Sequence, residues 1–161
     1  VIKFLDMDGV IIDSIEECYS VSKDAYYKNK SFIYSEDRYK KIFFKYRGHV
    51  RPPYEYFCLH NAIEYFYDEQ FDDLEFINFF NNTSKKFQHE DKVAFEETFF
   101  TIRLDYQNND FGSWIKMNPL TSFGETLKSK NNANTMVITT KNMQAAKKIL
   151  NFYSYVISSS K

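Results

Sequence analysis

The strongest constraint on the fold is that short apolar runs near both ends of the chain flank a long stretch of helical periodicity. One run occupies residues 1–5, a second extends from Met136 to Ile138, and a third covers 155–157. Short runs of this kind are typical of buried strands. Because strands that alternate with helices favour parallel pairing, the pattern predicts an α/β fold whose sheet is interrupted by a large helical insertion after the first strand.

Between these runs, apolar residues recur at spacings of three and four, which predicts a series of helices. Ser14 and Glu17 have the spacing of a capping box, so the first helix should begin there. The polar stretches 81–84 and 107–113 are predicted as breaks in the series. The helices are expected near 14–29, 39–46, 52–66, 72–80, 91–106, 118–127 and 142–151.

Composition argues against several classes of protein. The 161 residues include 21 basic and 22 acidic side chains, so the chain lacks the basic excess of a nucleic-acid-binding protein. Four Gly and three Pro are too few for the turns of a β-sandwich, and the two Cys lack zinc-ligand spacing. No signal peptide or membrane-spanning run is found in the sequence. We expect a cytoplasmic protein that binds neither nucleic acid nor membranes, in an unknown oligomeric state.

Reactive side chains follow the first two apolar runs. Asp6 and Asp8 come after the first run, and two Thr and a Lys occupy 139–141 after the second. Ligands of parallel sheets bind outside the carboxyl ends of the strands. Carboxylates at such an end can act as nucleophile or metal ligand and as proton donor, while hydroxyls before a helix suit phosphate oxygens. Taken alone, the two aspartates also fit a strand end that leads into a helix cap.

The longer sequence around these residues is more specific. Residues 4–14, FLDMDGVIIDS, resemble motif I of the haloacid dehalogenase superfamily, in which DxDGxxxDS follows an apolar run. Residues 137–141, VITTK, resemble its motif II in the T-x-K form of many phosphatase members. The resemblance implies a Rossmann-like parallel sheet core formed by residues 1–14 and 113–161. It also implies that residues 15–112 form an inserted, all-helical cap domain.

The resemblance further implies an enzyme, a phosphatase that hydrolyses a small phosphorylated metabolite through an aspartyl-phosphate. Asp6 would attack phosphorus, and Asp8 would protonate the leaving oxygen and then activate water. Mg²⁺ would bind the Asp6 carboxylate and the Asp8 backbone carbonyl. An aspartate at the second position favours phosphoryl transfer over carbon–halogen cleavage. The phosphoryl group would be held by Thr139, as a catalytic residue, and by Gly9, Thr140 and Lys141 as substrate-binding residues.

Two elements of the superfamily are not evident in this sequence. A lysine that steadies negative charge is expected after the third strand, and Lys161 is the candidate, although members usually place it farther on. The acidic residues that complete the magnesium shell after a fourth strand are absent from the sequence. We therefore expect either a piece of a longer protein or a degenerate metal site.

The helical insertion supplies a candidate for substrate selection. In capped members of the superfamily, a turn between cap helices reaches the active site, and the corresponding place here is 45–53. Arg47, His49 and Arg51 in this segment suit an anionic or hydroxylated substrate. The same residues also fit a solvated basic loop at a helix end.

Two other functions are compatible with these residues. A phosphomutase of the β-phosphoglucomutase kind would use the same aspartates and a similar cap, and fold and motif do not separate the two activities. A non-catalytic binding protein would keep the fold without a working metal site. The sequence leaves both alternatives open, together with the identity of the substrate.

Overall fold

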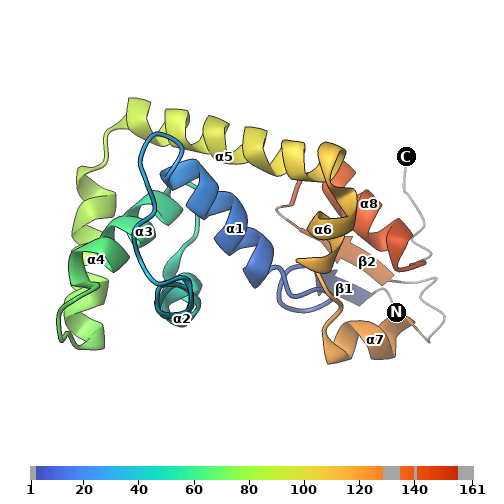
Figure 1. Cartoon of the computed structure of the whole chain (residues 1–161). Coiled ribbons are helices and arrows are strands. Elements are labelled where there is room, and N and C mark those ends of the chain that lie inside the picture. Colours follow the sequence, from blue (N-terminus) through green and yellow to red (C-terminus); the bar gives the residue numbers. More distant parts are fainter. Residues whose placement is uncertain (1–2, 129–134, 140, 156–161) are drawn as a thin grey trace. The chain divides into compact units, whose positions relative to one another are not determined.

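The computed structural model of the chain describes residues 3–128, 135–139 and 141–155 (Figure 1). Contacts between Cα atoms divide it into two units, which we describe separately. The split unit comprises Val1–Glu17 and Tyr106–Lys161, and the continuous unit comprises Cys18–Asp105. The chain changes unit at 17/18 and 105/106, compared with 14/15 and 112/113 in the division predicted from the sequence.

The split unit contains a sheet of two parallel strands. β1 (Lys3–Asp6) pairs with β2 (Thr135–Ile138) in a register that sets Asp6 opposite Ile138. Parallel strands point the same way, so both carboxyl ends lie at one edge of the sheet. The segments that follow the two strands therefore leave the sheet side by side.

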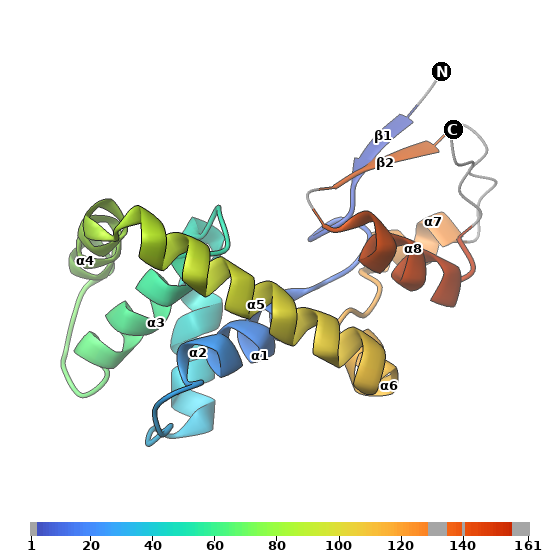
Figure 2. The same cartoon turned by 90° about the horizontal axis from the view of Figure 1, so that it is seen from above.

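One face of this sheet packs against helices. Leu5 and Val137 contact a core to which α6 (Phe111–Lys116), α7 (Ser122–Lys128) and α8 (Met143–Phe152) contribute. Figure 2 shows α7 and α8 on one side of the strand pair. The largest fully buried side chains of this core are those of Met7, Ile11, Ile12, Trp114 and Ile149. This packing fixes β1, and with it the segment that carries both aspartates.

The opposite face of the sheet is exposed. Because alternate residues of a strand face opposite sides, Phe4 shares a face with Met136 and Ile138. These side chains are 60%, 43% and 61% exposed. Within the described part of the chain, the sheet thus buries only one of its two faces.

The continuous unit is helical and has an aromatic core. Tyr39, Phe43, Phe76 and Phe99 are almost completely buried, and Tyr46 stacks on Phe76 with ring centroids 3.9 Å apart. The unit comprises most of α1 (Ile15–Tyr26), α2 (Glu36–Tyr46), a 3₁₀ turn (Arg47–His49), α3 (Glu55–Phe66), α4 (Asp73–Lys86) and most of α5 (His89–Asn109).

Both predicted helix breaks differ from the structure. Residues 81–84 lie inside α4, which continues to Lys86 because Phe76 and Phe80 anchor the helix in the core. The predicted break at 107–113 is largely helical too, since α5 extends to Asn109 and α6 starts at Phe111. Local polarity gave the wrong prediction because tertiary packing stabilises a helix more than intrinsic propensity does.

The predicted fold class is wrong. The described residues are mostly helical, and their only sheet has two strands, so there is no Rossmann-like multi-stranded core. The third predicted strand, 155–157, lies largely outside the described residues. Helices dominate the described residues because apolar side chains recur there at helical spacing, whereas only two segments of four residues in this part of the chain form strands.

Candidate active site

Asp6 and Asp8 lie at the carboxyl end of β1. Asp6 is the last residue of the strand and is exposed, and its Oδ1 accepts a hydrogen bond from the Met7 N–H at 2.7 Å. Asp8 is half-buried, and its Oδ1 accepts a hydrogen bond from the Ser14 hydroxyl at 2.7 Å. One carboxylate is therefore open to solvent, and the other is fixed by the protein.

A tight turn follows Asp8. Gly9 has a φ of +78°, in the left-handed region that favours glycine. Its N–H donates to the Ile12 carbonyl at 2.7 Å, and the Ile11 and Ile12 N–H groups donate to the Met7 carbonyl at 2.9 and 3.0 Å. The Gly9 amide, predicted to bind the phosphoryl group, thus makes a bond within the turn in this structure.

The segment before α7 forms hydrogen bonds with the residues that follow this turn. The Asp13 N–H donates to the Pro119 carbonyl at 2.8 Å, and the Thr121 N–H donates to the Ile11 carbonyl at 3.0 Å. Gly124 packs so closely that a Cβ built on it would lie 2.1 Å from the Ile11 carbonyl oxygen. Only glycine fits this approach, and the contact fixes the backbone that follows Asp8.

The end of β2 brings a hydroxyl and an ammonium group to the same edge. Thr139 is half-buried, and its Oγ1 accepts a hydrogen bond from the Lys141 N–H at 3.0 Å. Lys141 is buried, with its Nζ 3.3 Å from Asp8 Oδ1. The structure thus brings a predicted substrate-binding lysine into an ion pair with a predicted catalytic carboxylate. Thr140 and Lys161, also predicted as site residues, lie outside the described residues.

Lys141 has a second acidic partner, which the sequence did not indicate. Its Nζ lies 3.1 Å from Glu17 Oε2, and the Trp114 indole N–H donates to Glu17 Oε1 at 3.0 Å. The Glu17 and Trp114 side chains are completely buried. The only sequence signal at Glu17 was its spacing from Ser14, which predicted a capping box. Both residues instead contribute contacts to the candidate site.

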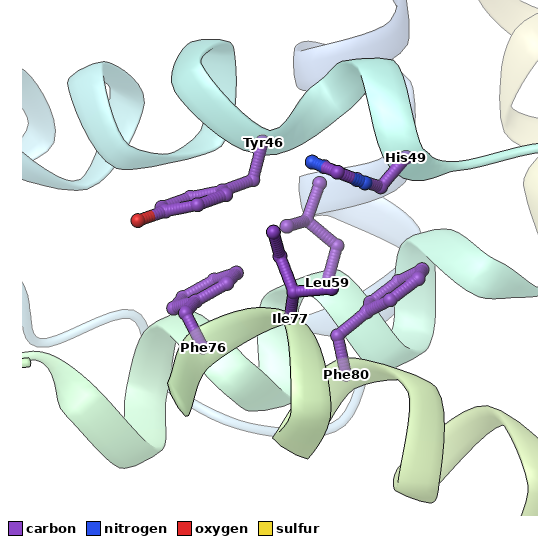
Figure 3. Close-up of a pocket in the computed structure, with 6 residues that line it drawn as sticks. All are labelled: Tyr46, His49, Leu59, Phe76, Ile77 and Phe80. Carbon is purple, nitrogen blue, oxygen red and sulfur yellow. The ribbon is translucent and has the colours of Figure 1, made fainter. Parts of the chain in front are cut away.

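The predicted substrate-selecting residues belong to the continuous unit. The Arg47 guanidinium lies over the Tyr56 ring at 5.1 Å, and Arg51 Nη1 donates to the Gly48 carbonyl at 3.0 Å. His49 borders a small apolar pocket whose side chains leave no room for a ligand. Figure 3 shows this pocket, lined by Tyr46, His49, Leu59, Phe76, Ile77 and Phe80. These contacts are internal to the continuous unit, so the assignment of the three basic residues to substrate stays a prediction.

The predicted ligands of a metal ion are the carboxylate of Asp6 and the backbone carbonyl of Asp8. The described residues contain no group of three or more Asp, Glu, His or Cys side chains placed to hold a metal ion. Mg²⁺ needs only one or two carboxylates, because water and phosphate oxygens complete its shell. The exposed Asp6 carboxylate and the adjacent Asp8 backbone fit that requirement.

Comparison with protein-family models, curated proteins and solved structures gave no match. In the described part of the chain, no helix is both long enough and apolar enough to cross a bilayer. The function proposed below therefore depends on the motifs and on the geometry of the candidate site.

Proposed function

We propose that this protein hydrolyses a small phosphomonoester through a phosphorylated Asp6, with Mg²⁺ as cofactor. The observation that carries the proposal is that parallel pairing of β1 and β2 sets Lys141 Nζ 3.3 Å from Asp8 Oδ1, at the edge where Asp6 and Thr139 also lie. The likeness of residues 4–14 and 137–141 to phosphatase motifs supports the same reaction.

In the first step, a carboxylate oxygen of Asp6 attacks phosphorus, and the bond between phosphorus and the ester oxygen breaks. Asp8, protonated at this stage, gives its proton to the leaving oxygen, which departs as an alcohol. Asp6 suits the nucleophile because it is exposed. The contacts of Asp8 with Ser14 and Lys141 both use Oδ1, so we assign proton transfer to Oδ2.

In the second step, the Asp8 carboxylate takes a proton from a water molecule, whose oxygen attacks the phosphorus of the aspartyl-phosphate. The bond between phosphorus and Asp6 breaks, which releases inorganic phosphate and restores the Asp6 carboxylate. Asp8 is protonated again and ready for the next cycle. Acid and base roles of one carboxyl group thus balance the protons over both steps.

Positive charge at the site supports the transfer. The Lys141 ammonium lies 3.3 Å from Asp8 Oδ1, and Thr139 Oγ1 accepts a hydrogen bond from the Lys141 backbone N–H at the end of β2. Fixed charges in a partly dry site stabilise developing negative charge better than solvent does. Mg²⁺, held by the Asp6 carboxylate and the Asp8 carbonyl, would add charge that neutralises phosphoryl oxygens.

The test is hydrolysis of p-nitrophenyl phosphate by the wild-type protein and by Asp6→Asn, with and without Mg²⁺. We expect kcat/KM to fall at least about a thousandfold in Asp6→Asn, because the amide cannot form the phosphorylated intermediate. Removal of Mg²⁺ with a chelator should abolish wild-type activity. The control is Asp13→Asn, since Asp13 lies in the same segment but its Oδ1 accepts from the Ile15 N–H at 3.1 Å, a bond that Asn also makes.

Activity that survives Asp6→Asn would overturn the nucleophile assignment. Equal loss in Asp13→Asn would show that the segment tolerates no substitution, and the phosphorylated residue would then be sought directly. For that purpose, wild-type protein is quenched during turnover, and the mass of the peptide that contains Asp6 is measured. A wild-type peptide that never gains a phosphoryl group contradicts the covalent mechanism.

A further inference from the structure

Behind the candidate active site lies a buried network of charged and polar side chains. Lys141 is 8% exposed and Glu17 0%, although surface positions are usual for both residue types. The two oxygens of Glu17 have different partners, since Oε1 accepts from the Trp114 indole and Oε2 pairs with Lys141. Both oxygens of the carboxylate are therefore fixed.

The three residues come from parts of the chain that are far apart. Glu17 lies in the first turn of α1, Trp114 in α6, and Lys141 between β2 and α8. All three belong to the split unit, as does Asp8. Because Asp8 and Glu17 lie 3.3 and 3.1 Å from the same Nζ, the ammonium group bridges an accessible carboxylate and a buried one.

The physical consequence concerns the mobility of Lys141. A lysine side chain has a long, flexible stem and a strongly hydrated ammonium group, which favours solvent unless nearby charges compensate for the lost water. Asp8 is half-buried and can bind water or substrate instead of Lys141. Glu17 has no such access, so its negative charge remains beside Lys141 throughout a reaction cycle.

We propose that Glu17 is a positioning residue, which holds the Lys141 ammonium against Asp8 and is itself held by Trp114. The proposal rests on the phosphatase function proposed above and adds a residue to its machinery. Loss of the negative charge at Glu17 releases Lys141 toward solvent and removes a fixed positive charge from the site. α1 thus contributes to the reaction through Glu17, which contacts Lys141 and does not contact the substrate.

The experiment compares wild type with Glu17→Gln, which keeps the shape and the acceptor for Trp114 but removes the charge. The first readout is acetylation of lysines by acetic anhydride, followed by peptide mass spectrometry. Lys141 should label slowly in the wild type and faster in the variant, whereas the nearby Lys148, which bonds to Asn108, should label equally in both. The second readout is kinetics, in which kcat should fall about 10- to 100-fold while KM changes much less.

Glu16→Gln is the matched control, because it makes the same chemical change at the adjacent residue of α1. It should leave Lys141 labelling and kcat unchanged. Urea unfolding of every variant establishes that the protein is folded under assay conditions. If Glu17→Gln does not fold, Trp114→Phe replaces it, since this change removes the indole hydrogen bond that orients Glu17 and should also raise Lys141 labelling.

Lys141 labelling that stays at the wild-type rate in a folded variant overturns the proposal, and so does raised labelling with unchanged kcat. Failure of the proposed function has a different signature, because the wild-type protein would then lack phosphatase activity from the outset. Raised labelling in Glu17→Gln would still show, in that case, that Glu17 positions Lys141.

Discussion

At the centre of the continuous unit, the His60 ring is completely buried among aromatic side chains. Ser22 Oγ lies 2.9 Å from its Nε2, and Tyr39 Oη lies 2.8 Å from its Nδ1. Burial, together with the nearby charges of Lys30 and Lys23, lowers the pKa of His60 to about 3. The ring is therefore neutral in the folded protein at physiological pH.

This shift predicts how stability changes with acidity. Between about pH 6.5 and about pH 3, the unfolded chain binds a proton at His60 that the folded protein does not, so the free energy of unfolding falls as pH decreases. The slope attributable to His60 approaches about 1.4 kcal/mol per pH unit. In His60→Gln, urea unfolding measured across this window should show a shallower dependence on pH.

The matched control for that prediction is His89→Gln, because His89 is exposed at the start of α5. It should keep the wild-type slope. An identical pH dependence in His60→Gln and wild type would contradict the prediction, whatever the stability of the variant at neutral pH.

The candidate site was only partly predictable at the level of single residues. Asp6, Asp8 and Lys141 belong to short local patterns, so their grouping at one edge of the sheet could be predicted from sequence. Glu17 and Trp114 could not, since the contact between them joins α1 to α6 and depends on tertiary packing. No local pattern marks a glutamate that will be buried.

Among the elements, α7 has a direct influence on the segment that carries the aspartates. A Cβ at Gly124 would lie 2.1 Å from the Ile11 carbonyl oxygen, and the Thr121 hydroxyl also donates to the Val10 carbonyl. Gly124→Ala should therefore displace this segment and lower the free energy of unfolding by about 1–3 kcal/mol. It should also reduce kcat, because Asp8 lies directly before the displaced residues.

Gly112→Ala in α6 is the control for this prediction, since a Cβ there meets nothing within 4 Å. Its free energy of unfolding should stay the same or rise by up to about 1 kcal/mol, as alanine favours helices over glycine. Urea unfolding and phosphatase kinetics measure both effects. Equal stability of the two variants would show that the protein accommodates a Cβ at position 124 without loss of stability and would contradict the prediction.

Elements were predictable where the pattern is local and long enough. The observed α8 and β2 lie within a residue or two of the predicted 142–151 and 136–138. α6 could not be predicted, because six residues give too little periodicity, although Asp110 caps it by accepting from the Ser113 N–H at 3.1 Å. In α4, by contrast, the buried side chains of Phe76 and Phe80 keep the chain helical through a polar stretch that predicted a break.

For the whole molecule, the error in fold class arose from counting strands. Apolar runs flanking a helical block predicted a multi-stranded sheet, whereas the described residues form only one parallel pair. A sheet of two strands buries little area, and here it leaves Phe4, Met136 and Ile138 exposed on one face. Sequence periodicity detects individual strands but does not determine how many of them pair.

The exposed face leads to a prediction about surface hydrophobicity. Replacing Phe4 by Thr, which suits a strand, should lower the fluorescence of a bound apolar dye such as anilinonaphthalene sulfonate and reduce light scattering at high concentration. Leu74→Thr is the comparison, because Leu74 is 67% exposed on α4 and outside this face. Equal dye binding by wild type and Phe4→Thr would show that the face does not act as an apolar patch.

The pairing of β1 with β2 also sets an order of events during protein synthesis. β1 is among the first described segments to leave the ribosome, and its partner β2 emerges only after every helix from α1 to α7. The helices of the continuous unit can find their neighbours earlier, since closing a short loop costs less entropy than closing a long one. A nascent chain therefore carries Asp6 and Asp8 through the synthesis of α1 to α7 without Thr139 and Lys141 beside them. The proposed site can therefore assemble only after β2 and Lys141 have emerged from the ribosome.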